Sequence, residues 1–218
     1  MSRLAILGGT AGQGFGLALR FAAAGEALII GSRSADKAAQ AVAAIRERVA
    51  GARVSGAENL AAVAEAERVL LAFPAAGLAP FLEVAAPALA GKLVIDVMVP
   101  LSFHRGFADV SALEGARSMG ELVQARAPQA RVVSAFKNVP AELLTDLQRR
   151  LEGDVLVCSD DDAARAEVIE LVRHVRALRP VDAGPLAGAR HLETITALLV
   201  NLNRRHRART SIAIVGLP

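Results

Sequence analysis

Five glycines stand close together near the start of the chain, directly after the apolar run Leu4–Leu7. Residues 8–16 read GGTAGQGFG and lead into a stretch rich in Leu and Ala, which predicts a helix over Phe15–Ala24. A strand that turns tightly into a helix exposes unpaired backbone N–H groups at the positive end of the helix dipole, and glycines let a pyrophosphate approach that backbone. The segment predicts a dinucleotide site, with an ordinary glycine-rich turn as the alternative.

The spacing of these glycines departs from the standard Gly-x-Gly-x-x-Gly pattern. Ala11 stands where the second glycine belongs, and we expect Gly12 to take over its role. Gly9 and Gly12 are the glycines of this turn that we expect to contact the dinucleotide.

The second apolar run ends in side chains that select between the two nicotinamide dinucleotides. An NAD-selective site has an Asp or Glu here to bind the ribose 2′-hydroxyl, and that carboxylate repels a 2′-phosphate. In this chain the run ends in Ser32 and Arg33, and Lys37 follows one helical turn later. A hydroxyl, a guanidinium and an ammonium bind a phosphate, so the sequence predicts NADP. The alternative is an N-cap serine followed by solvated bases.

Two apolar segments that contain proline, Val99-Pro100 and Val139-Pro140, each follow an expected strand. The carboxyl edge of a parallel sheet is where such folds bind ligands, and few polar groups suit two flat rings that meet in a dry slot. Packing in the core is the alternative. Lys137 and Asn138 precede the second segment. The roles open to them are to polarise a carbonyl, to bind a substrate ring or to lie in a solvated loop.

The other residues of chemical interest have ordinary structural explanations. The four histidines, at positions 104, 174, 191 and 206, do not have the spacing of metal ligands. Cys158 is the single cysteine, which excludes an intrachain disulfide and a multi-cysteine metal site. The run Asp160–Asp162 precedes a helix, where acidic residues complement the dipole. We therefore expect no metal site and no catalytic acid or base.

The strongest basic cluster is near the end of the chain, where residues 204–209 read RRHRAR. Positive charge is favourable at the C-terminus of a helix, so solvated helix-end charges are one explanation. The second is the binding of an anionic ligand, for which Arg204 and Arg207 are the candidates. Nucleic acid is a weak third possibility because the cluster is short and lacks aromatic residues.

Short apolar runs alternate with longer helical stretches over most of the chain. The expected strands are Leu4–Leu7, Ala27–Ile30, Val69–Phe73, Leu93–Val97, Arg131–Ala135 and Val155–Val157. The expected helices are Phe15–Ala24, Ala35–Val49, Leu78–Leu89, Glu121–Ala127, Ala141–Leu151 and Ala163–Val175. This alternation predicts an α/β fold, a Rossmann-type doubly wound parallel sheet.

A boundary is expected at Gly153-Asp154, which divides the chain into a dinucleotide-binding domain, 1–153, and a small α/β C-terminal subdomain, 154–218. The second part is predicted to hold a strand–helix–strand unit to about Asp182, a helix over Leu186–Arg205 and a short strand over Ile212–Val215. It is too small to fold alone, so we expect it to dock on the first part and complete the cleft.

Composition narrows the class of protein. The 218 residues are 53% hydrophobic and 22% charged, which is enough for a substantial core. Aromatic residues make up 3%, which argues against a stacking surface for nucleic acid, and the net charge of +3 favours small anionic ligands. The apolar stretches 4–19 and 69–91 are interrupted by glycines and prolines, so we expect no membrane partner. With one cysteine, a reducing cytoplasm is the expected location.

Over its whole length the chain resembles the NADPH-dependent coenzyme F420 (8-hydroxy-5-deazaflavin) oxidoreductase family. The matching stretches are GGT at 8–10, GFGLALR at 14–20, GSR at 31–33, DVMVPL at 96–101, AFKNVPA at 135–141, DVLVC at 154–158, LRPVDAGPL at 178–186 and NLNRR at 201–205. The last two stretches are the most distinctive, because other dinucleotide-binding proteins lack them.

The resemblance implies hydride transfer between nicotinamide C4 and deazaflavin C5, usually in a homodimer, with the deazaflavin bound between the two parts of the chain. The residues that would hold the adenosine end and the phosphates of NADP are Thr10, Gly12, Gln13, Ser32, Arg33 and Lys37. Phe73, Val99 and Ala141 would line the nicotinamide side. Asn138 and Pro140 would contact the deazaflavin, and Arg204 and Arg207 its phosphate and glutamate tail.

Two departures from the family pattern concern the substrate more than NADP. Ala75-Ala76-Gly77 replaces bulkier side chains, and Ser159 stands where glycine is common. Two other functions therefore stay open: an NADPH-dependent reductase of another acceptor, such as a flavin, a quinone or a small carbonyl compound, and a non-catalytic NADP-binding protein.

Overall fold

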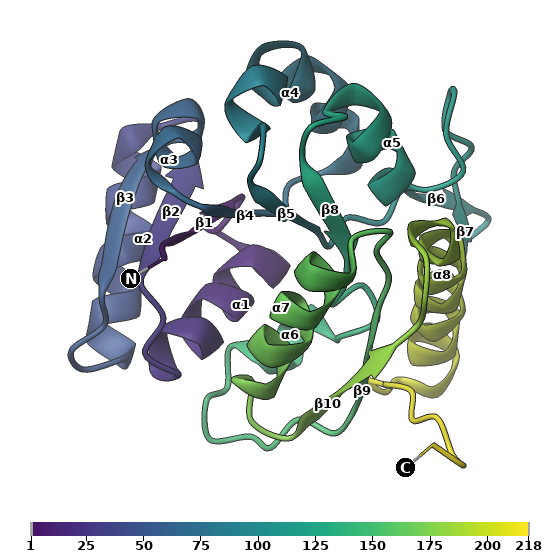
Figure 1. The fold of residues 1–218 in the computed structure, drawn as a ribbon. Helices are drawn as coiled ribbons and strands as arrows, with labels where there is room; N and C mark the ends of the chain where they lie inside the picture. Colours follow the sequence, from purple (N-terminus) through teal and green to yellow (C-terminus); the bar gives the residue numbers. More distant parts are fainter. Residues whose placement is uncertain (1, 218) are drawn as a thin grey trace.

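Six parallel strands form the central sheet of the structure, a computed structural model that describes residues 2–217. Their order is β3-β2-β1-β4-β5-β8, which places the topological switch of a doubly wound fold between β1 and β4 (Figure 1). The strands are β1 (Leu4–Leu7), β2 (Leu28–Ser32), β3 (Val54–Glu58), β4 (Arg68–Leu71), β5 (Leu93–Asp96) and β8 (Arg131–Ser134). The predicted fold class is confirmed.

Helices cover both faces of the sheet. One face carries α1 (Gly12–Ala23), α2 (Ala35–Arg48) and α7 (Asp162–Arg173), and the other carries α3 (Asn59–Glu65), α4 (Leu78–Ala85) and α5 (Met119–Arg126) (Figure 1). Successive side chains of a strand point to opposite faces. Leu4 and Ile6 of β1 accordingly pack in one apolar cluster, and Ala5 and Leu7 pack in the other. Both clusters hold the carboxyl edge of the sheet in place.

The apolar stretch 69–91 folds as a strand, a turn and a packed helix, as expected from its prolines. It contains most of β4, a 3₁₀ turn over Ala75–Gly77, helix α4 and a second 3₁₀ turn over Ala86–Leu89. Within residues 2–217, no helix is long and apolar enough to cross a membrane.

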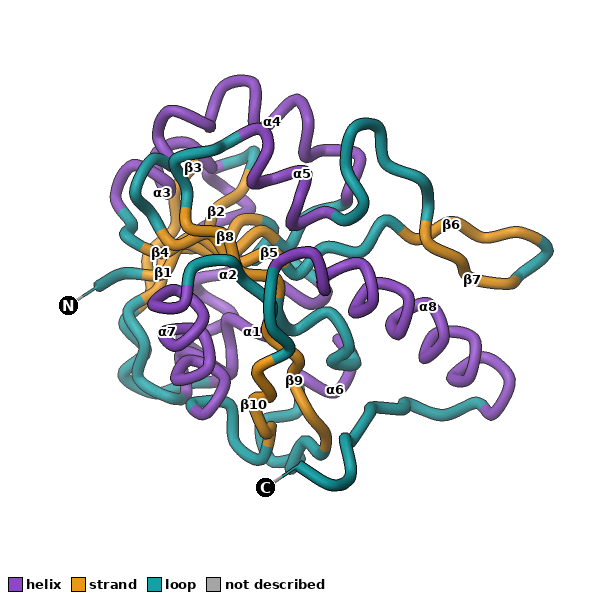
Figure 2. The backbone as a smooth tube through the Cα atoms, turned by 45° about the vertical axis from the view of Figure 1, so that its right-hand side comes forward, coloured by secondary structure: helices purple, strands orange, loops and turns teal. Residues whose placement is uncertain are grey.

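Four elements were missed by the sequence analysis because they lack an apolar run. Edge strand β3 reads VSGAE and has mostly exposed or half-buried side chains, and the seven-residue helix α3 follows it directly. Strands β6 (Leu101–His104) and β7 (Phe107–Val110) form an antiparallel hairpin outside the main sheet. Figure 2 shows this hairpin projecting from the body of the molecule beside the last helix.

The helix predicted over Ala141–Leu151 is wrong beyond its first turn. Helix α6 covers only Ala141–Leu144, and an irregular segment follows. The buried guanidinium of Arg20, on α1, donates to the carbonyl groups of Leu144 and Arg149 at 2.9 and 3.1 Å. These long-range hydrogen bonds satisfy carbonyl groups that would otherwise need a helix, so tertiary contact overrides the local pattern.

The C-terminal part contributes two parallel strands, β9 (Gly153–Val157) and β10 (Leu178–Asp182), joined by α7, and the long helix α8 (Ala189–His206). Backbone hydrogen bonds between Ser134 and Cys158, at 2.9 and 3.0 Å, tie β9 to the end of β8. Val168 of α7 belongs to the same apolar cluster as Leu4, so this part docks on the sheet through a shared core. The division of the chain after residue 153 stays a prediction.

The strand predicted over Ile212–Val215 is wrong. The segment has no regular secondary structure, although it runs beside β9. The carbonyl group of Ile212 accepts from Asp154 N–H at 2.8 Å, and the N–H group of Ile214 donates to the Asp154 carboxylate at 2.5 Å. A side chain thus replaces the second backbone partner that a strand would need.

Candidate functional site: a cleft at the carboxyl edge of the sheet

A cleft of about 1390 Å³ runs along the carboxyl ends of the parallel strands and continues to the C-terminal end of α8. Loops after β1, β2, β4, β5 and β8 line it, together with residues from α8 and the segment that follows. Of the predicted site residues, those that line it are Thr10, Gly12, Gln13, Ser32, Arg33, Lys37, Phe73, Val99, Asn138, Pro140 and Ala141. The fold therefore brings eleven of the fourteen predicted residues to one cavity.

The glycine-rich turn packs tightly on its strand side and stays open toward the cleft. Gly8 has φ +83°, and a Cβ there would lie 2.6 Å from the carbonyl oxygen of Ala72. A Cβ on Gly14 would lie 2.5 Å from the carbonyl oxygen of Gly8, so these two glycines let α1 approach the sheet. Gly12 has φ +53°, and a Cβ there would have no neighbour within 4 Å. The open position is the one expected to face a phosphate.

Gly9 has a different position from the one predicted. It is buried, and a Cβ there would lie 2.9 Å from the carbonyl oxygen of Ile6 and 3.2 Å from the side chain of Ile30. Gly9 does not line the cleft, whereas Gly8 does. Its role in the turn is close packing against β1 and β2.

The three residues predicted to select NADP lie together at the end of β2 and the start of α2. Ser32 is 8% exposed, and its hydroxyl oxygen accepts from Ser34 N–H at 3.2 Å. Ser34, not Ser32, is the N-cap of α2 and accepts from Lys37 N–H. Arg33 and Lys37 are exposed, and neither forms an ion pair with any residue in 2–217. Two unpaired cations and a hydroxyl thus face one end of the cleft.

Asn59 lies in the same end of the cleft and was missed by the sequence analysis. It is the first residue of α3, and its side-chain oxygen Oδ1 is buried with no hydrogen-bond partner in the described chain. A buried acceptor without a donor costs free energy, which a ligand donor would recover. No motif marks this residue, because it depends on an edge strand and a helix that the sequence pattern did not reveal.

The other end of the cleft is mainly apolar. Phe73 packs edge-on against Phe81, with ring centroids 5.3 Å apart. Val99 and Ala141 also line this region, and both are half-buried. The Gln13 side chain donates to the carbonyl oxygen of Phe136 at 2.6 Å, which ties the glycine-rich turn to the loop after β8. A flat ring would be shielded from water here.

Asn138 is buried at the junction of the two parts of the chain. Its Nδ2 donates to the carbonyl oxygen of Asp154 at 2.6 Å, while its Oδ1 is buried without a partner. One hydrogen bond therefore orients the amide, and a free acceptor remains in a residue that lines the cleft. The alternative of a solvated loop is excluded, because Asn138 is 3% exposed.

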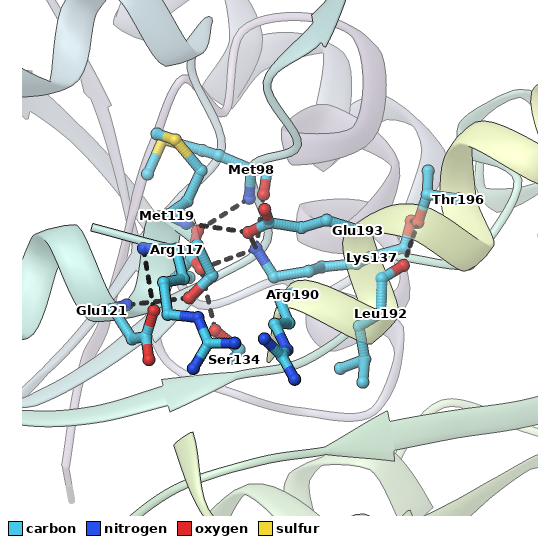
Figure 3. A network of polar contacts seen from close by, with 12 residues as sticks. Met98, Arg117, Met119, Glu121, Ser134, Lys137, Arg190, Leu192, Glu193 and Thr196 are labelled. Atoms are coloured by element: carbon cyan, nitrogen blue, oxygen red, sulfur yellow. Dashed lines mark hydrogen bonds and ion pairs between the residues drawn. The ribbon is translucent and has the colours of Figure 1, made fainter. Parts of the chain in front are cut away.

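Lys137 is also buried, so it too does not belong to a solvated loop. Its Nζ lies 2.6 Å from Asp96 Oδ2 and 3.1 Å from Glu193 Oε1, and it donates to the carbonyl oxygen of Met98 (Figure 3). All three ionisable side chains are fully buried. Burial, with the charge of Asp96, raises the pKa of the Glu193 carboxyl, while Lys137 opposes that rise.

The C-terminal arginines divide into two groups. The guanidinium of Arg204 lies over the ring of Phe103 in the β6–β7 hairpin, 5.8 Å from its centroid. Neither Arg204 nor Arg207 lines the cleft, whereas Arg209 does and pairs with Glu142. The basic cluster predicted from the sequence therefore reaches the cleft at a different residue from the two that we expected.

The remaining titratable residues behave as structural groups. Asp161 is the N-cap of α7 and accepts from Ala164 N–H at 2.8 Å, as predicted. Burial raises the pKa of the Cys158 thiol to about 11, which keeps it protonated and unreactive. In the described part of the chain, no three His, Cys, Asp or Glu side chains are grouped so that they could hold a metal ion.

A family model described as NADP oxidoreductase, coenzyme F420-dependent, matches residues 3–100. The F420-dependent NADP reductase of Methanocaldococcus jannaschii is 37% identical over 223 residues, which cover 99% of both chains. The protein of the same name from Methanothermobacter marburgensis is 38% identical over 225 residues, again with 99% of each chain covered. The similarity extends over both the sheet and the C-terminal part.

A solved structure has the same overall fold. It comes from Arthrobacter sp. FB24 and is described as a candidate F420-dependent NADP reductase. The TM-score is 0.81 and the identity 26%, and the match covers 99% of this chain and 100% of the other. The arrangement of the sheet, the C-terminal strands and α8 is therefore shared with that protein.

Proposed function

The chain belongs to the coenzyme F420-dependent NADP oxidoreductase family, and from that premise we propose that it transfers a hydride between NADP(H) and coenzyme F420. The observation that carries the proposal is a single cleft with a cationic end and an apolar end. The cationic end suits the phosphorylated adenosine of NADP. The apolar end suits the nicotinamide and deazaflavin rings, which would meet there with water excluded.

The cationic end of the cleft fits NADP both by its charge and by its polar side chains that lack a partner. Arg33 and Lys37 have no partner of their own among residues 2–217, and Asn59 holds a buried acceptor next to them. A 2′-phosphate would pair with the two cations and the Ser32 hydroxyl. Asn59 Oδ1 can accept a hydrogen bond from a hydroxyl or amino group of the adenosine.

The first turn of α1 would hold the pyrophosphate. Thr10, Gly12 and Gln13 line the cleft where the backbone N–H groups of the helix have no internal partners. Gly12 leaves room for a phosphate oxygen, and Gly9 shapes the turn from its buried side. Gln13 holds this turn against the loop after β8, so both ends of the dinucleotide would bind along one edge of the sheet.

Phe73, Val99 and Ala141 would enclose the nicotinamide, and Asn138 and Pro140 the deazaflavin ring. When both are bound, the nicotinamide and the deazaflavin supply the hydride chemistry themselves. The protein then contributes placement and exclusion of water, which accounts for the small number of polar groups at this end of the cleft. Asn138 Oδ1 supplies an acceptor of fixed orientation for a ring N–H group.

The anionic tail of coenzyme F420 would bind near the C-terminal end of α8. Arg209 lines the cleft there, and Asn203 and Thr210 lie beside it. The side chain of Glu142 pairs with Arg209, and a phosphate of the tail would replace Glu142 as the partner of Arg209. Arg207 follows the helix with φ +50° and is exposed, so it is available to a tail that leaves the cleft.

We also propose that the protein works as a homodimer in a reducing cytoplasm. Phe103, Phe107 and Leu198 are 54%, 62% and 56% exposed, and they lie on the β6–β7 hairpin and on α8. Large apolar side chains left exposed on these two neighbouring elements favour association. Light scattering after size exclusion should give the mass of two chains, and Phe107→Ser should shift it toward one chain. Fractionation of the source cells tests the location.

The direct test of the reaction mixes NADPH with oxidised coenzyme F420 and follows the loss of the deazaflavin absorbance, then runs the reverse reaction. A flavin, a quinone and a small carbonyl compound serve as alternative acceptors. We expect turnover with coenzyme F420 that exceeds turnover with the other acceptors. Faster reduction of any of them would assign the protein to another acceptor, and no turnover with any would indicate a binding protein.

A further inference from the structure

The ammonium group of Lys137 joins three segments that are far apart in the sequence (Figure 3). Lys137 follows β8, Asp96 is the last residue of β5 with Met98 two residues beyond it, and Glu193 comes from α8. Each of the three segments also contributes a wall of the cleft, through Met98, through Asn138 and through Thr196 of α8. The Lys137 side chain therefore connects segments that form three walls of the cleft.

The hydrogen bonds of Lys137 are complete within the protein. An ammonium group has three donors, and the three acceptors are Asp96 Oδ2, Glu193 Oε1 and the carbonyl oxygen of Met98. No donor is left for a ligand, which separates Lys137 from a substrate-binding lysine. The backbone of Lys137 is held as well, because its carbonyl oxygen accepts from the Thr196 hydroxyl at 3.0 Å.

The partners of Lys137 are themselves fixed by further hydrogen bonds. Asp96 accepts from Met98 N–H at 3.0 Å and from the Ser134 hydroxyl at 2.9 Å. Glu193 Oε1 accepts from Met119 N–H, at the start of α5, at 2.8 Å. Met98 is thus held at both its N–H and its carbonyl group, although it belongs to no strand or helix.

Charge balance explains how two carboxyl groups and one ammonium can share a buried site. A second buried negative charge would be costly. Glu193 Oε2 is buried and has no partner in the described chain, and the pKa of this carboxyl is raised by burial. With a proton on Glu193, Asp96 and Lys137 form a neutral pair.

Lys137 itself lines the cleft, but its side chain is fully buried, so only its backbone reaches the cleft. We propose that Lys137 is a positioning residue, whose side chain holds the Met98–Val99 segment and α8 at the spacing that hydride transfer requires without touching either substrate. The part of the inference that concerns hydride transfer rests on the proposed function. Its physical basis is the tie between the loops after β5 and β8, since Val99 follows directly on a residue that Lys137 holds. A displacement of reacting groups by about 1 Å can cost about 100-fold in rate.

The test removes the tie without leaving a buried charge. In Lys137→Met combined with Asp96→Asn, both charges are lost and side-chain shapes are kept, so the protein should fold. The matched control is Arg131→Met with Glu167→Gln, which removes a 3.5 Å ion pair that also involves a residue of β8 but is partly exposed. Full-length proteins are compared by melting temperature and by amide hydrogen exchange without ligands.

We expect both double variants to melt close to the wild type. Exchange in peptides over 96–101 and 137–140 should be at least tenfold faster in the Lys137 double variant and unchanged in the control. In single turnover, hydride transfer should fall by about 10- to 100-fold. The NADP dissociation constant should stay within about threefold, because the cationic end of the cleft is intact.

The proposal is overturned if the Lys137 double variant shows wild-type exchange in these peptides and a wild-type rate of hydride transfer. It is also overturned if the melting temperature of that variant is the only property that changes. Wild-type protein gives a second measure that does not depend on a variant: the Met98 amide should exchange as slowly as those of β5, and exchange at the rate of a free loop would refute the tie. A wild-type enzyme that transfers no hydride to coenzyme F420 would refute the proposed function instead, while exchange still decides whether Lys137 holds these walls.

Discussion

The carboxylate of Asp154 and the guanidinium of Arg179 form a bidentate ion pair, with Nε–Oδ1 and Nη2–Oδ2 distances of 2.7 and 2.8 Å. These residues lie opposite each other on β9 and β10. The carboxylate also accepts from Ile214 N–H, and Arg179 donates to the Ile214 carbonyl at 2.7 Å. One ion pair therefore joins the two C-terminal strands and the end of the chain.

The pair predicts how stability depends on pH. The hydrogen bond from Arg179 lowers the pKa of Asp154 below its usual value of 3.8, although burial opposes this. A lowered folded-state pKa stabilises the fold above the unfolded pKa, and this is lost as pH falls through the folded pKa. Asp154→Asn should therefore lower the melting temperature at pH 7, by about 2–4 °C for each kcal/mol lost. The gap from wild type should shrink below about pH 4.

Thermal unfolding of both proteins between pH 2.5 and pH 7 measures this gap. Asp109→Asn is the control, because Asp109 is exposed and, within residues 2–217, its carboxylate accepts a hydrogen bond from the neighbouring Val110 N–H alone. If the difference in melting temperature between wild type and Asp154→Asn is as large at pH 2.5 as at pH 7, the lowered pKa of Asp154 is contradicted.

Arg33→Ala should weaken NADP binding and leave NAD binding nearly unchanged. Arg33 has no partner among residues 2–217 and faces the end of the cleft assigned to the 2′-phosphate. The loss of one charged hydrogen bond costs about 1–3 kcal/mol, which corresponds to roughly 5- to 150-fold in the dissociation constant. Calorimetric titration with both nucleotides measures it. Equal affinity of the wild type for NADP and NAD would refute the selection by Ser32, Arg33 and Lys37.

Gly12→Val should abolish nucleotide binding at a small cost in stability. The position is open, because a Cβ there would have no protein atom within 4 Å, and the valine side chain would occupy the space expected for a phosphate. The φ of +53° adds strain of about 1–2 kcal/mol for a residue with a Cβ. Nucleotide titration and thermal unfolding separate the two effects. Normal NADP binding by a folded variant would show that the phosphate lies elsewhere in the turn.

Arg209→Glu should raise the Michaelis constant for coenzyme F420 several-fold more than Arg204→Glu. Arg209 lines the cleft, whereas Arg204 lies over Phe103 on the hairpin. The effect should shrink as salt rises, because interactions of exposed charges are screened beyond about 10 Å at 0.1 M. The Michaelis constant for a deazaflavin without the anionic tail should be unchanged by both substitutions. A larger effect of Arg204→Glu than of Arg209→Glu would instead place the tail along the β6–β7 hairpin, away from Arg209.

The sequence alone was informative wherever the chemistry depends on neighbours in the chain. The glycine-rich turn, the helix start at Ala35 and the pair Ser32-Arg33 could all be interpreted because a strand, a tight turn and a helix N-terminus follow one another directly. Strands buried on both faces have continuous apolar runs, so five of the six strands of the sheet were found. Edge strand β3 was missed, because its exposed residues carry no such run.

The tertiary structure decided everything that depends on partners far apart in the chain. Arg20 ends helix α6 from 124 residues away, and no local pattern reveals that the carbonyl groups after Leu144 have a donor. Lys137 meets Asp96 and Glu193 only when three segments pack together, so a lysine that the sequence left open to a ligand or to a solvated loop is buried. Arg209, not Arg204, reaches the cleft because of the direction in which the chain leaves α8. Local sequence determines which short-range hydrogen bonds can form, while burial and long-range partners exist only once the chain has folded.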